Sequence, residues 1–216
     1  MSTCITIHDL RRALRLSRFD ARAAQRLMVP APRGWEKRAD PPKQAAVMIL
    51  VFDDAAGCLQ SALTLRNADL RGHSGQVSFP GGRVEPGDKD ALDTARRETV
   101  EEIGICPARV QPLGRLAKLY IPASHYDVTP VVARYVGIPA FSPNAFEVAE
   151  LFTFALDDLL HPERKAEERR LIRGVDVRVP YYALSGYKVW GATAIMLSEL
   201  EGRLLRARQF AMRETG

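Results

Sequence analysis

The chain has 216 residues, which is enough for one full-sized hydrophobic core, alone or with a small appendage. Its 46% hydrophobic and 26% charged residues are ordinary for a globular enzyme and exclude a low-complexity or fibrous protein. No apolar run approaches the roughly 20 residues that span a bilayer, and the N-terminus lacks the apolar stretch of a secretory signal.

The net charge of +5 is carried by residues 1–40, which hold nine Lys or Arg and four Asp or Glu, while the remainder is balanced. A basic arm can attract a substrate phosphate, a nucleic acid or a membrane surface. An amphipathic helix with a solvated basic face would have the same composition. The three cysteines, Cys4, Cys58 and Cys106, form no C-x-x-C pair, so we expect reduced thiols in a cytoplasmic protein.

Residues 6–28 have apolar positions among arginines and are predicted to form one or two helices. Proline and glycine then make residues 28–42 a linker, so residues 1–43 are expected to be a basic helical arm. The continuous apolar run at residues 45–52 predicts a strand buried on both faces. Residues 61–65 return as its hairpin partner, and residues 66–82 form a loop with a short strand at 77–79.

A helix is predicted over the second half of residues 81–105. Five residues at helical spacing form one stripe facing a core: Ala91, Leu92, Ala95, Thr99 and Ile103. Asp88 or Asp90 can cap its start, and Gly104 suits its left-handed end.

Three glutamates of this helix lie at i, i+3 and i+4, so their carboxylates gather on one strip: Glu98, Glu101 and Glu102. Arg97 lies four residues before Glu101 and is within reach of an ion pair. Like charges repel, and a divalent cation would offset that repulsion, because Mg²⁺ or Mn²⁺ prefers hard oxygen ligands. A solvated acidic face is the plainer interpretation of such a cluster.

Strands are predicted at residues 113–121, 127–136 and 151–155, and a short helix at 156–160. Residues 161–170 are charged and are expected to be an exposed connection. Residues 171–179 and 181–184 predict a closing hairpin on either side of Pro180, before a final helix at 191–207.

The run from Gly81 to Ile105 resembles the Nudix box: Gly, five residues, Glu, seven residues, Arg-Glu, aliphatic, any residue, Glu-Glu, any residue, Gly, aliphatic. Three positions depart from that pattern. Asp88 stands where Glu is expected, eight residues rather than seven precede Arg97, and Thr99 replaces an aliphatic residue. The second half, from Arg97 to Gly104, is intact, and it is the half that would hold metal. The insertion falls in the loop before the helix, where length is tolerated, so it weakens the argument for a role of Asp88 more than the argument for catalysis.

Upstream, Leu-Arg-x-His-x-Gly-Gln-Val-x-Phe-Pro-Gly-Gly at residues 70–82 resembles the coenzyme A diphosphatases of the Nudix superfamily. This resemblance covers roughly residues 44–208, with 209–216 as a tail. It implies phosphate contacts from side chains and from backbone N–H groups of the loop: Arg66, Arg71, His73, Gln76, Gly81 and Gly82. The Asn-x-x-Glu-Val-Ala-Glu segment resembles the place where such proteins bring a loop acid toward the metal, with Glu147 the better candidate and Glu150 the second.

The resemblance implies an α/β/α sandwich with a mixed sheet, and an enzyme that uses Mg²⁺ or Mn²⁺. The expected reaction is hydrolysis of coenzyme A or an acyl-CoA to 3′,5′-ADP and a 4′-phosphopantetheine. Glu98 or Glu147 would accept the proton of the attacking water, and Arg97 would orient a glutamate. Two alternatives stay open: hydrolysis of ADP-ribose or a dinucleotide, and a noncatalytic binder whose arm holds nucleic acid. A monomer and a homodimer are equally compatible with the sequence.

Overall fold

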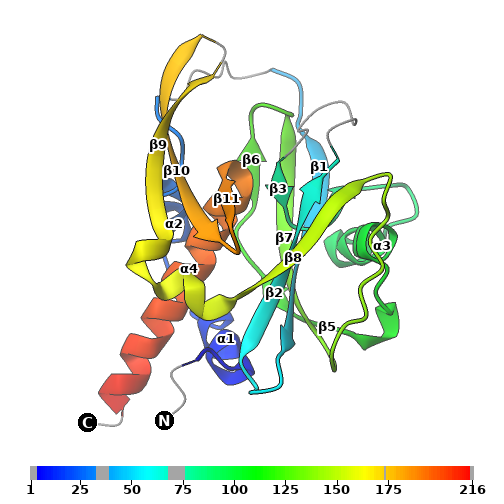
Figure 1. The fold of residues 1–216 in the computed structure, drawn as a ribbon, viewed down its shortest axis with the longest axis vertical. Helices are drawn as coiled ribbons and strands as arrows, with labels where there is room; N and C mark the ends of the chain where they lie inside the picture. The colour runs from blue at the N-terminus through cyan, green and yellow to red at the C-terminus, as the bar shows by residue number, and fades with distance from the viewer. Residues whose placement is uncertain (1–3, 33–38, 68–75, 173, 215–216) are drawn as a thin grey trace.

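A computed structural model describes residues 4–32, 39–67, 76–172 and 174–214 (Figure 1). The α-helices are α1 (Ile7–Leu14), α2 (Ala21–Arg26), α3 (Ala91–Ile103) and α4 (Gly191–Glu214). The 3₁₀-helices are η1 (Pro107–Arg109), η2 (Leu156–Leu160) and η3 (Pro162–Arg164). The strands are β1 (Lys43–Asp53), β2 (Leu59–Arg66), β3 (Val77–Ser78), β4 (Gly81–Arg83), β5 (Val110–Arg115), β6 (Leu119–Ile121), β7 (Tyr126–Tyr135), β8 (Val148–Ala155), β9 (Lys165–Ile172), β10 (Val175–Leu184) and β11 (Tyr187–Trp190). Among the described helices, none has the length and hydropathy needed to cross a membrane.

Strand β1 lies in the middle of the main sheet, which has eight strands within the described residues. It runs parallel to β7, from Lys43 opposite Tyr126 to Val51 opposite Arg134. It is antiparallel to β2 and β4, and β8 extends the sheet beyond β2. The expected mixed sheet and the hairpin at its start are therefore confirmed.

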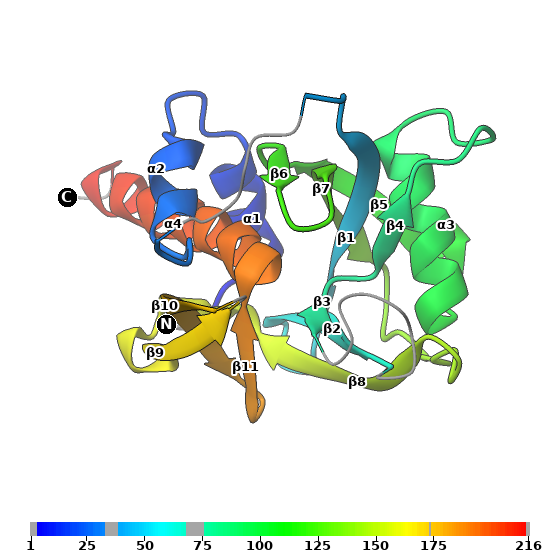
Figure 2. The same ribbon diagram turned by 90° about the horizontal axis from the view of Figure 1, so that it is seen from above.

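The two faces of β1 pack against different helices, as Figure 2 shows with α3 on one side of the sheet and α1 and α4 on the other. Met48 and Leu50 belong to the core under α3, whereas Ile49 and Val51 belong to the core that α1 and α4 share. Successive side chains of a strand point to opposite faces, so a strand covered on both sides must be apolar throughout. This confirms the predicted α/β/α sandwich and explains the unbroken apolar run.

A second, three-stranded sheet in the order β11-β10-β9 covers part of α4. Residues 161–170 are mostly exposed, as expected, but the prediction of a connection is wrong from Lys165 onward, because β9 occupies Lys165–Ile172 and pairs with β10. Strand β10 also continues through Pro180. The charged residues of β9 form cross-strand ion pairs, such as Arg169–Asp176 at 2.5 Å and Arg178–Glu167 at 2.8 Å. Such pairs stabilise a strand only in this register, which the linear sequence does not reveal.

The N-terminal segment packs into the main core rather than extending from it. Ile5, Leu10 and Ala13 are fully buried, in the same cluster as the apolar side of α4. The predicted helices are confirmed as α1 and α2. The division of the chain at residue 43 stays a prediction.

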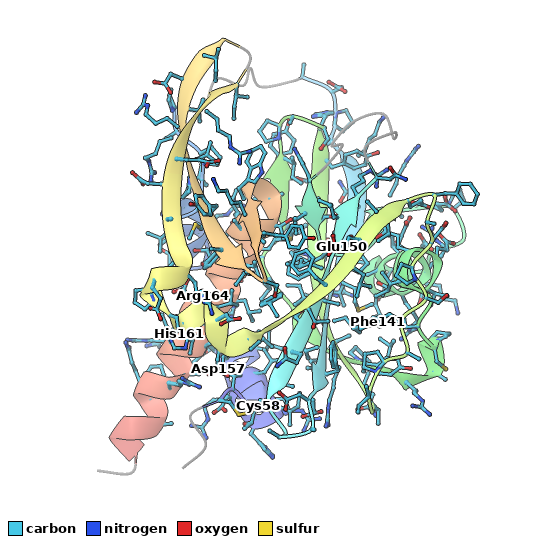
Figure 3. All side chains as sticks on the ribbon, viewed as in Figure 1. Cys58, Phe141, Glu150, Asp157, His161 and Arg164 are labelled. Carbon is cyan, nitrogen blue, oxygen red and sulfur yellow. A yellow bond between two sulfur atoms is a disulfide. The ribbon has the colours of Figure 1, made fainter. Side chains whose placement is uncertain are left out.

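The expectation of three reduced cysteines is wrong, because Cys4 and Cys58 form a disulfide. It joins the segment before α1 to the turn between β1 and β2. Beside it, the Leu59 N–H donates to the Ile5 carbonyl at 3.0 Å, and the Ile5 N–H donates to Asp157 Oδ2 at 2.6 Å. Figure 3 labels Cys58 and Asp157 at this end of the molecule. Cys106 is an exposed free thiol.

The single strand predicted at residues 113–121 is divided into β5 and β6. Between them, the Ala117 N–H donates to both carboxylate oxygens of Glu199 in α4, each at 3.1 Å. Glu199 is fully buried and also accepts from Gln25 of α2 at 2.9 Å. A buried polar contact with a distant helix thus interrupts a locally strand-like sequence.

Candidate active site

Helix α3 is capped at both ends. Its glutamates lie in its second half. The Asp90 carboxylate accepts from the N–H groups of Leu92 and Asp93 at 2.8 and 3.1 Å. Gly104 ends the helix at φ 66°, and a Cβ there would lie 2.6 Å from the Ser142 carbonyl oxygen. Of the two predicted N-caps, Asp90 is therefore the one observed.

Arg97 donates to three carboxylates and one backbone carbonyl. Its guanidinium reaches Glu98 at 2.9 Å, Glu101 at 3.2 Å and the Arg83 carbonyl at 3.0 Å. Two further bonds of 3.2 and 3.1 Å go to the two oxygens of Asp88. The predicted Arg97–Glu101 ion pair is confirmed, and these contacts fix the guanidinium against the glutamates.

Asp88 has a larger part in this arrangement than its position in the sequence suggested. Its carboxylate also accepts from the Glu85 N–H and from the Thr94 hydroxyl, both at 2.9 Å. The bonds from Arg97, foremost, hold the pKa of the Asp88 carboxyl well below its usual range. The loop before α3 accommodates the extra residue and still places the Asp88 carboxylate within hydrogen-bond distance of Arg97. The five-residue spacing from Gly82 was the signal that could have identified it.

Glu102 is buried and Glu98 is partly buried beside the glycine pair. Only 5% of Glu102 is exposed, and burial, followed by the charges of Glu98 and Glu147, raises the pKa of its carboxyl to about 8. The Gly81 N–H and the charge of Arg66 act in the opposite direction. Burial also raises the pKa of Glu98, against the effect of its bond to Arg97. Two desolvated carboxyls that disfavour each other's charge are typical of a functional site.

The glycine pair lies directly against these carboxyls and against β1. A Cβ on Gly82 would lie 2.4 Å from the carboxyl carbon of Glu98. A Cβ on Gly81 would lie 2.4 Å from the Ala46 carbonyl oxygen. Only glycine allows this close approach of the chain.

The loop between β7 and β8 brings Glu147 to the same place. The Asn144 N–H donates to the Glu102 carbonyl at 2.9 Å, at the end of α3. The Asn67 N–H donates to the Glu147 carbonyl at 2.9 Å, at the end of β2. The charge of Glu147 acts on both Glu98 and Glu102. Glu150 instead accepts a hydrogen bond from Tyr187, which raises the pKa of that phenol.

Of the predicted phosphate-binding side chains, Arg66 and Gln76 lie within the described residues. The Arg66 N–H donates to the Gln76 carbonyl at 3.1 Å, and the charge of Arg66 acts on Glu102. Arg71 and His73 lie outside the described residues.

The donor set fits a divalent cation in its chemistry, although the side chains are not arranged as metal ligands. Within the described ranges, no three His, Cys, Asp or Glu side chains form a metal-binding group. Glu101 is half exposed and is directed to Arg97. Glu98 and Glu102, however, supply partly buried and buried hard oxygen atoms, and a cation would offset the repulsion between their charges.

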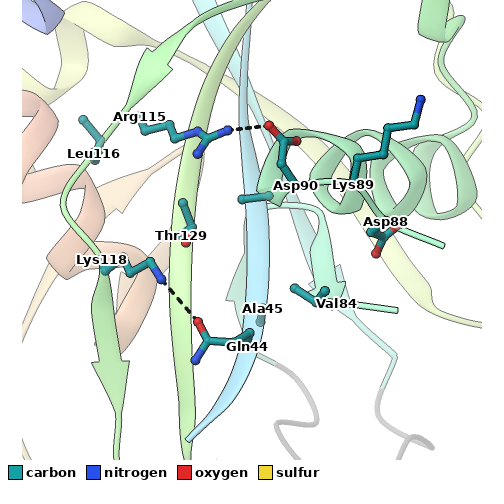
Figure 4. A pocket seen from close by; sticks show the side chains of 11 residues that line it. Gln44, Ala45, Val84, Asp88, Lys89, Asp90, Arg115, Leu116, Lys118 and Thr129 are labelled. Atoms are coloured by element: carbon teal, nitrogen blue, oxygen red, sulfur yellow. Dashed lines mark hydrogen bonds and ion pairs between the residues drawn. The ribbon is translucent and has the colours of Figure 1, made fainter. Parts of the chain in front are cut away.

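A cavity of about 410 Å³ opens near the start of α3 (Figure 4). Arg115 and Lys118 line it and already bond to Asp90 at 2.7 Å and to Gln44 at 3.3 Å. Asp88 is on its wall, whereas Glu98, Glu101 and Glu102 are not. The chemically distinctive groups therefore lie beside this cavity and not within it.

Comparisons with known proteins identify similar sequences and a similar fold. Residues 42–175 match the family model described as NUDIX domain. The "Uncharacterized Nudix hydrolase NudL" of Pectobacterium atrosepticum is 39% identical over 169 residues, which cover 73% of this chain and 81% of the relative. "Nudix hydrolase 15, mitochondrial" of Arabidopsis thaliana is 36% identical over 162 residues, which cover 72% and 56%. A solved MutT/nudix family protein from Enterococcus faecalis shares the fold, with a TM-score of 0.50 and 15% identity over 96% of this chain and 76% of that one.

Proposed function

Because the chain belongs to the Nudix family, we propose that it is a metal-dependent hydrolase of the pyrophosphate bond in a nucleoside diphosphate derivative. The observation that carries this proposal is the position of the buried Glu102 carboxyl and the partly buried Glu98 carboxyl beside Gly81 and Gly82 of β4. Buried carboxyls have a large energetic cost unless a cation or a proton neutralises them. Gly81 and Gly82 are proposed to let the backbone of β4 approach the phosphate that such a cation would also contact.

The residues proposed to hold Mg²⁺ or Mn²⁺ are Glu98 and Glu102, with Glu101 sharing the cluster. The bound ion would offset the charge that grows on the phosphoryl oxygens and make water easier to deprotonate. Arg97 orients Glu98 through their bond of 2.9 Å, and Asp88 fixes Arg97 from the other side.

The chain itself provides the base and the phosphate contacts in this proposal. Glu98 or Glu147 accepts the proton of the attacking water, whose oxygen bonds to one phosphorus as the bridging P–O bond breaks. The positive charge of Arg66 lies near Glu102, where it can meet a substrate phosphate. Gln76, Arg71 and His73 are proposed to assist from the same segment of the chain.

The proposed substrate is coenzyme A or an acyl-CoA, with 3′,5′-ADP and a 4′-phosphopantetheine as products. The Leu-Arg-x-His-x-Gly-Gln-Val-x-Phe-Pro-Gly-Gly string at residues 70–82 supports this choice over other nucleotides. The cytoplasmic location and the monomeric or homodimeric state stay predictions. The Cys4–Cys58 disulfide removes the reduced-thiol argument for that location.

A substrate panel with identified products tests the proposal. We expect turnover of coenzyme A with Mg²⁺ or Mn²⁺, its loss on chelation, and slower turnover of ADP-ribose and dinucleotides. Faster turnover of ADP-ribose than of coenzyme A would support the proposed hydrolysis and refute the proposed substrate. If the folded protein with bound metal hydrolysed no substrate of the panel, the assignment as a hydrolase would be refuted.

Glu102→Gln keeps the size of the side chain and removes its charge. We expect turnover to fall by at least a hundredfold with the melting temperature kept, because a proposed metal ligand is lost. Glu163→Gln is the control, since its side chain is 69% exposed, at a distance from α3 along the chain. A rate within twofold of the wild type for Glu102→Gln would exclude it as a ligand.

A further inference from the structure

Phe146 is exposed in a way that the packing of the chain does not explain. Its side chain is 86% exposed, the highest value among the large hydrophobic residues that the structure describes. The other exposed phenylalanine, Phe210, is 39% exposed and packs against the Arg206 guanidinium at 4.6 Å. Exposing an aromatic ring forgoes the stabilisation that its burial would provide.

The backbone that carries Phe146 is anchored on both sides. The Phe146 N–H donates to Asn144 Oδ1 at 3.1 Å, and the Asn144 N–H is bonded to the end of α3. On the other side, Asn67 donates from its side chain to the Ala145 carbonyl at 3.2 Å and from its backbone to the Glu147 carbonyl. The exposed ring is therefore attached to a held loop, which lowers the entropy cost of ligand binding.

The same loop belongs to the proposed active site. Glu147, the next residue, acts through its charge on Glu98 and Glu102. Val148, one residue further, is opposite Arg66 in the register of β8 and β2. Consecutive Cα atoms are about 3.8 Å apart, so Phe146 lies no more than about 8 Å along the chain from Val148, the residue opposite Arg66.

We propose that Phe146 is a stacking platform for the nucleobase of the substrate, with the pyrophosphate held at Gly81, Gly82 and the glutamates. This inference rests on the proposed function and specifies where the nucleoside half binds. A flat ring stacks on a base at little conformational cost and without selecting among bases. Asn144, Ala145 and Glu147, its neighbours along the chain, are small or polar, so they add no apolar surface beside the ring.

Steady-state kinetics on the preferred nucleotide substrate test the role of the ring. We expect Phe146→Ala to raise KM about tenfold or more with kcat within threefold, because stacking contributes to binding. Phe146→Tyr should stay within twofold of the wild type. Ile138→Ala is the matched control, since Ile138 is 73% exposed on the same connection between β7 and β8. If Phe146→Ala behaves like Ile138→Ala, or lowers kcat alone, the stacking role is overturned.

Competition between two inhibitors separates the base from the phosphates. The inhibition constant of ADP should rise about tenfold in Phe146→Ala, whereas that of inorganic pyrophosphate should not change. If the inhibition constants of ADP and pyrophosphate rose equally, the substitution would act on phosphate binding, and the stacking role would be refuted.

A binding measurement keeps this inference distinct from the hydrolase proposal. In Phe146→Trp, saturating ADP with Mg²⁺ should quench fluorescence beyond the change seen in the wild type, which carries Trp35 and Trp190. Saturable quenching without hydrolysis would support the platform and refute the enzyme. Hydrolysis by the wild type, without extra quenching in Phe146→Trp, would support the hydrolase proposal and refute the platform.

Discussion

Arg97 and Asp88 hold each other in place through hydrogen bonds within the protein. The guanidinium uses two bonds on Asp88, and the Asp88 side chain is only 7% exposed. Charge-assisted bonds to a nearly buried carboxylate contribute more to stability than exposed ion pairs. The pair thus holds the loop before α3 against the helix that carries the glutamates.

The low pKa of Asp88 in the folded protein makes the contribution of this pair pH-dependent. The contribution is fully present above the unfolded value near 3.8 and is lost as the pH falls through the lower folded value. We expect Asp88→Asn to lower the free energy of unfolding by about 1–3 kcal/mol at pH 7. In urea titrations from pH 7 to pH 3, this difference from the wild type should shrink below pH 4.

Asp176→Asn is the control, because Asp176 forms its ion pair while 57% exposed. Its effect at pH 7 should be below about 1 kcal/mol. A difference for Asp88→Asn that grew on acidification would contradict the sign of the pKa shift.

Gly82 gives a second prediction at the residue scale. We expect Gly82→Ala to reduce turnover by about a hundredfold, since its methyl group would displace the Glu98 carboxyl. Gly87, in the turn that follows β4, provides a control, because a Cβ there meets nothing within 4 Å. Parallel kinetics of Gly82→Ala and Gly87→Ala check this, and equal rates would show that Glu98 tolerates the displacement.

Among the elements, the segment before α1 is fixed to the β1–β2 turn by a covalent bond. The disulfide spans 54 residues, so it restricts the unfolded chain considerably. We expect Cys58→Ser, or dithiothreitol added to the wild type, to lower the free energy of unfolding by about 2–4 kcal/mol. Denaturant titrations with and without reductant measure this difference.

Cys106→Ser is the control for that experiment, because Cys106 is exposed and unpaired. It should remain as stable as the wild type and as sensitive to reductant. Stability of the wild type that does not change with reductant would show that the bond contributes nothing in solution.

At the scale of the whole molecule, the basic arm is part of the structure that supports the sheet. Leu10 is fully buried between α1 and the core, whereas Leu27 is 69% exposed. We expect Leu10→Ala to cost about 2–5 kcal/mol in the free energy of unfolding and Leu27→Ala less than about 0.5 kcal/mol. Thermal and urea unfolding of both variants check this. Similar costs for the two would mean that α1 docks only loosely.

This packing also affects how the nucleic-acid alternative can be tested. Deleting residues 1–40 would remove Ile5, Leu10 and Ala13 from the core together with the positive charge. Substituting exposed basic residues such as Arg11 and Arg12 leaves the core intact. Loss of nucleic-acid binding in such a variant, with no hydrolysis in the wild type, would favour the binder.

Local signals in the sequence determined much of this protein. The apolar run at residues 45–52 determined the central strand, since both its faces are covered. The spacing of Ala95, Thr99 and Ile103 determined the buried face of α3, because helical periodicity depends only on the chain itself. The resemblance of residues 81–105 led to the family and to the candidate glutamates.

The tertiary structure alone decided the features that depend on partners distant in sequence. The charged strand β9 needs its partners on β10, the break at Ala117 needs Glu199, and the disulfide needs Cys4 beside Cys58. Asp88 became a partner of Arg97 only when the loop folded back, and Phe146 became a candidate only when its exposure and anchoring were known. Composition and periodicity report the local preferences of a chain, whereas these features arise from contacts between segments that the fold brings together.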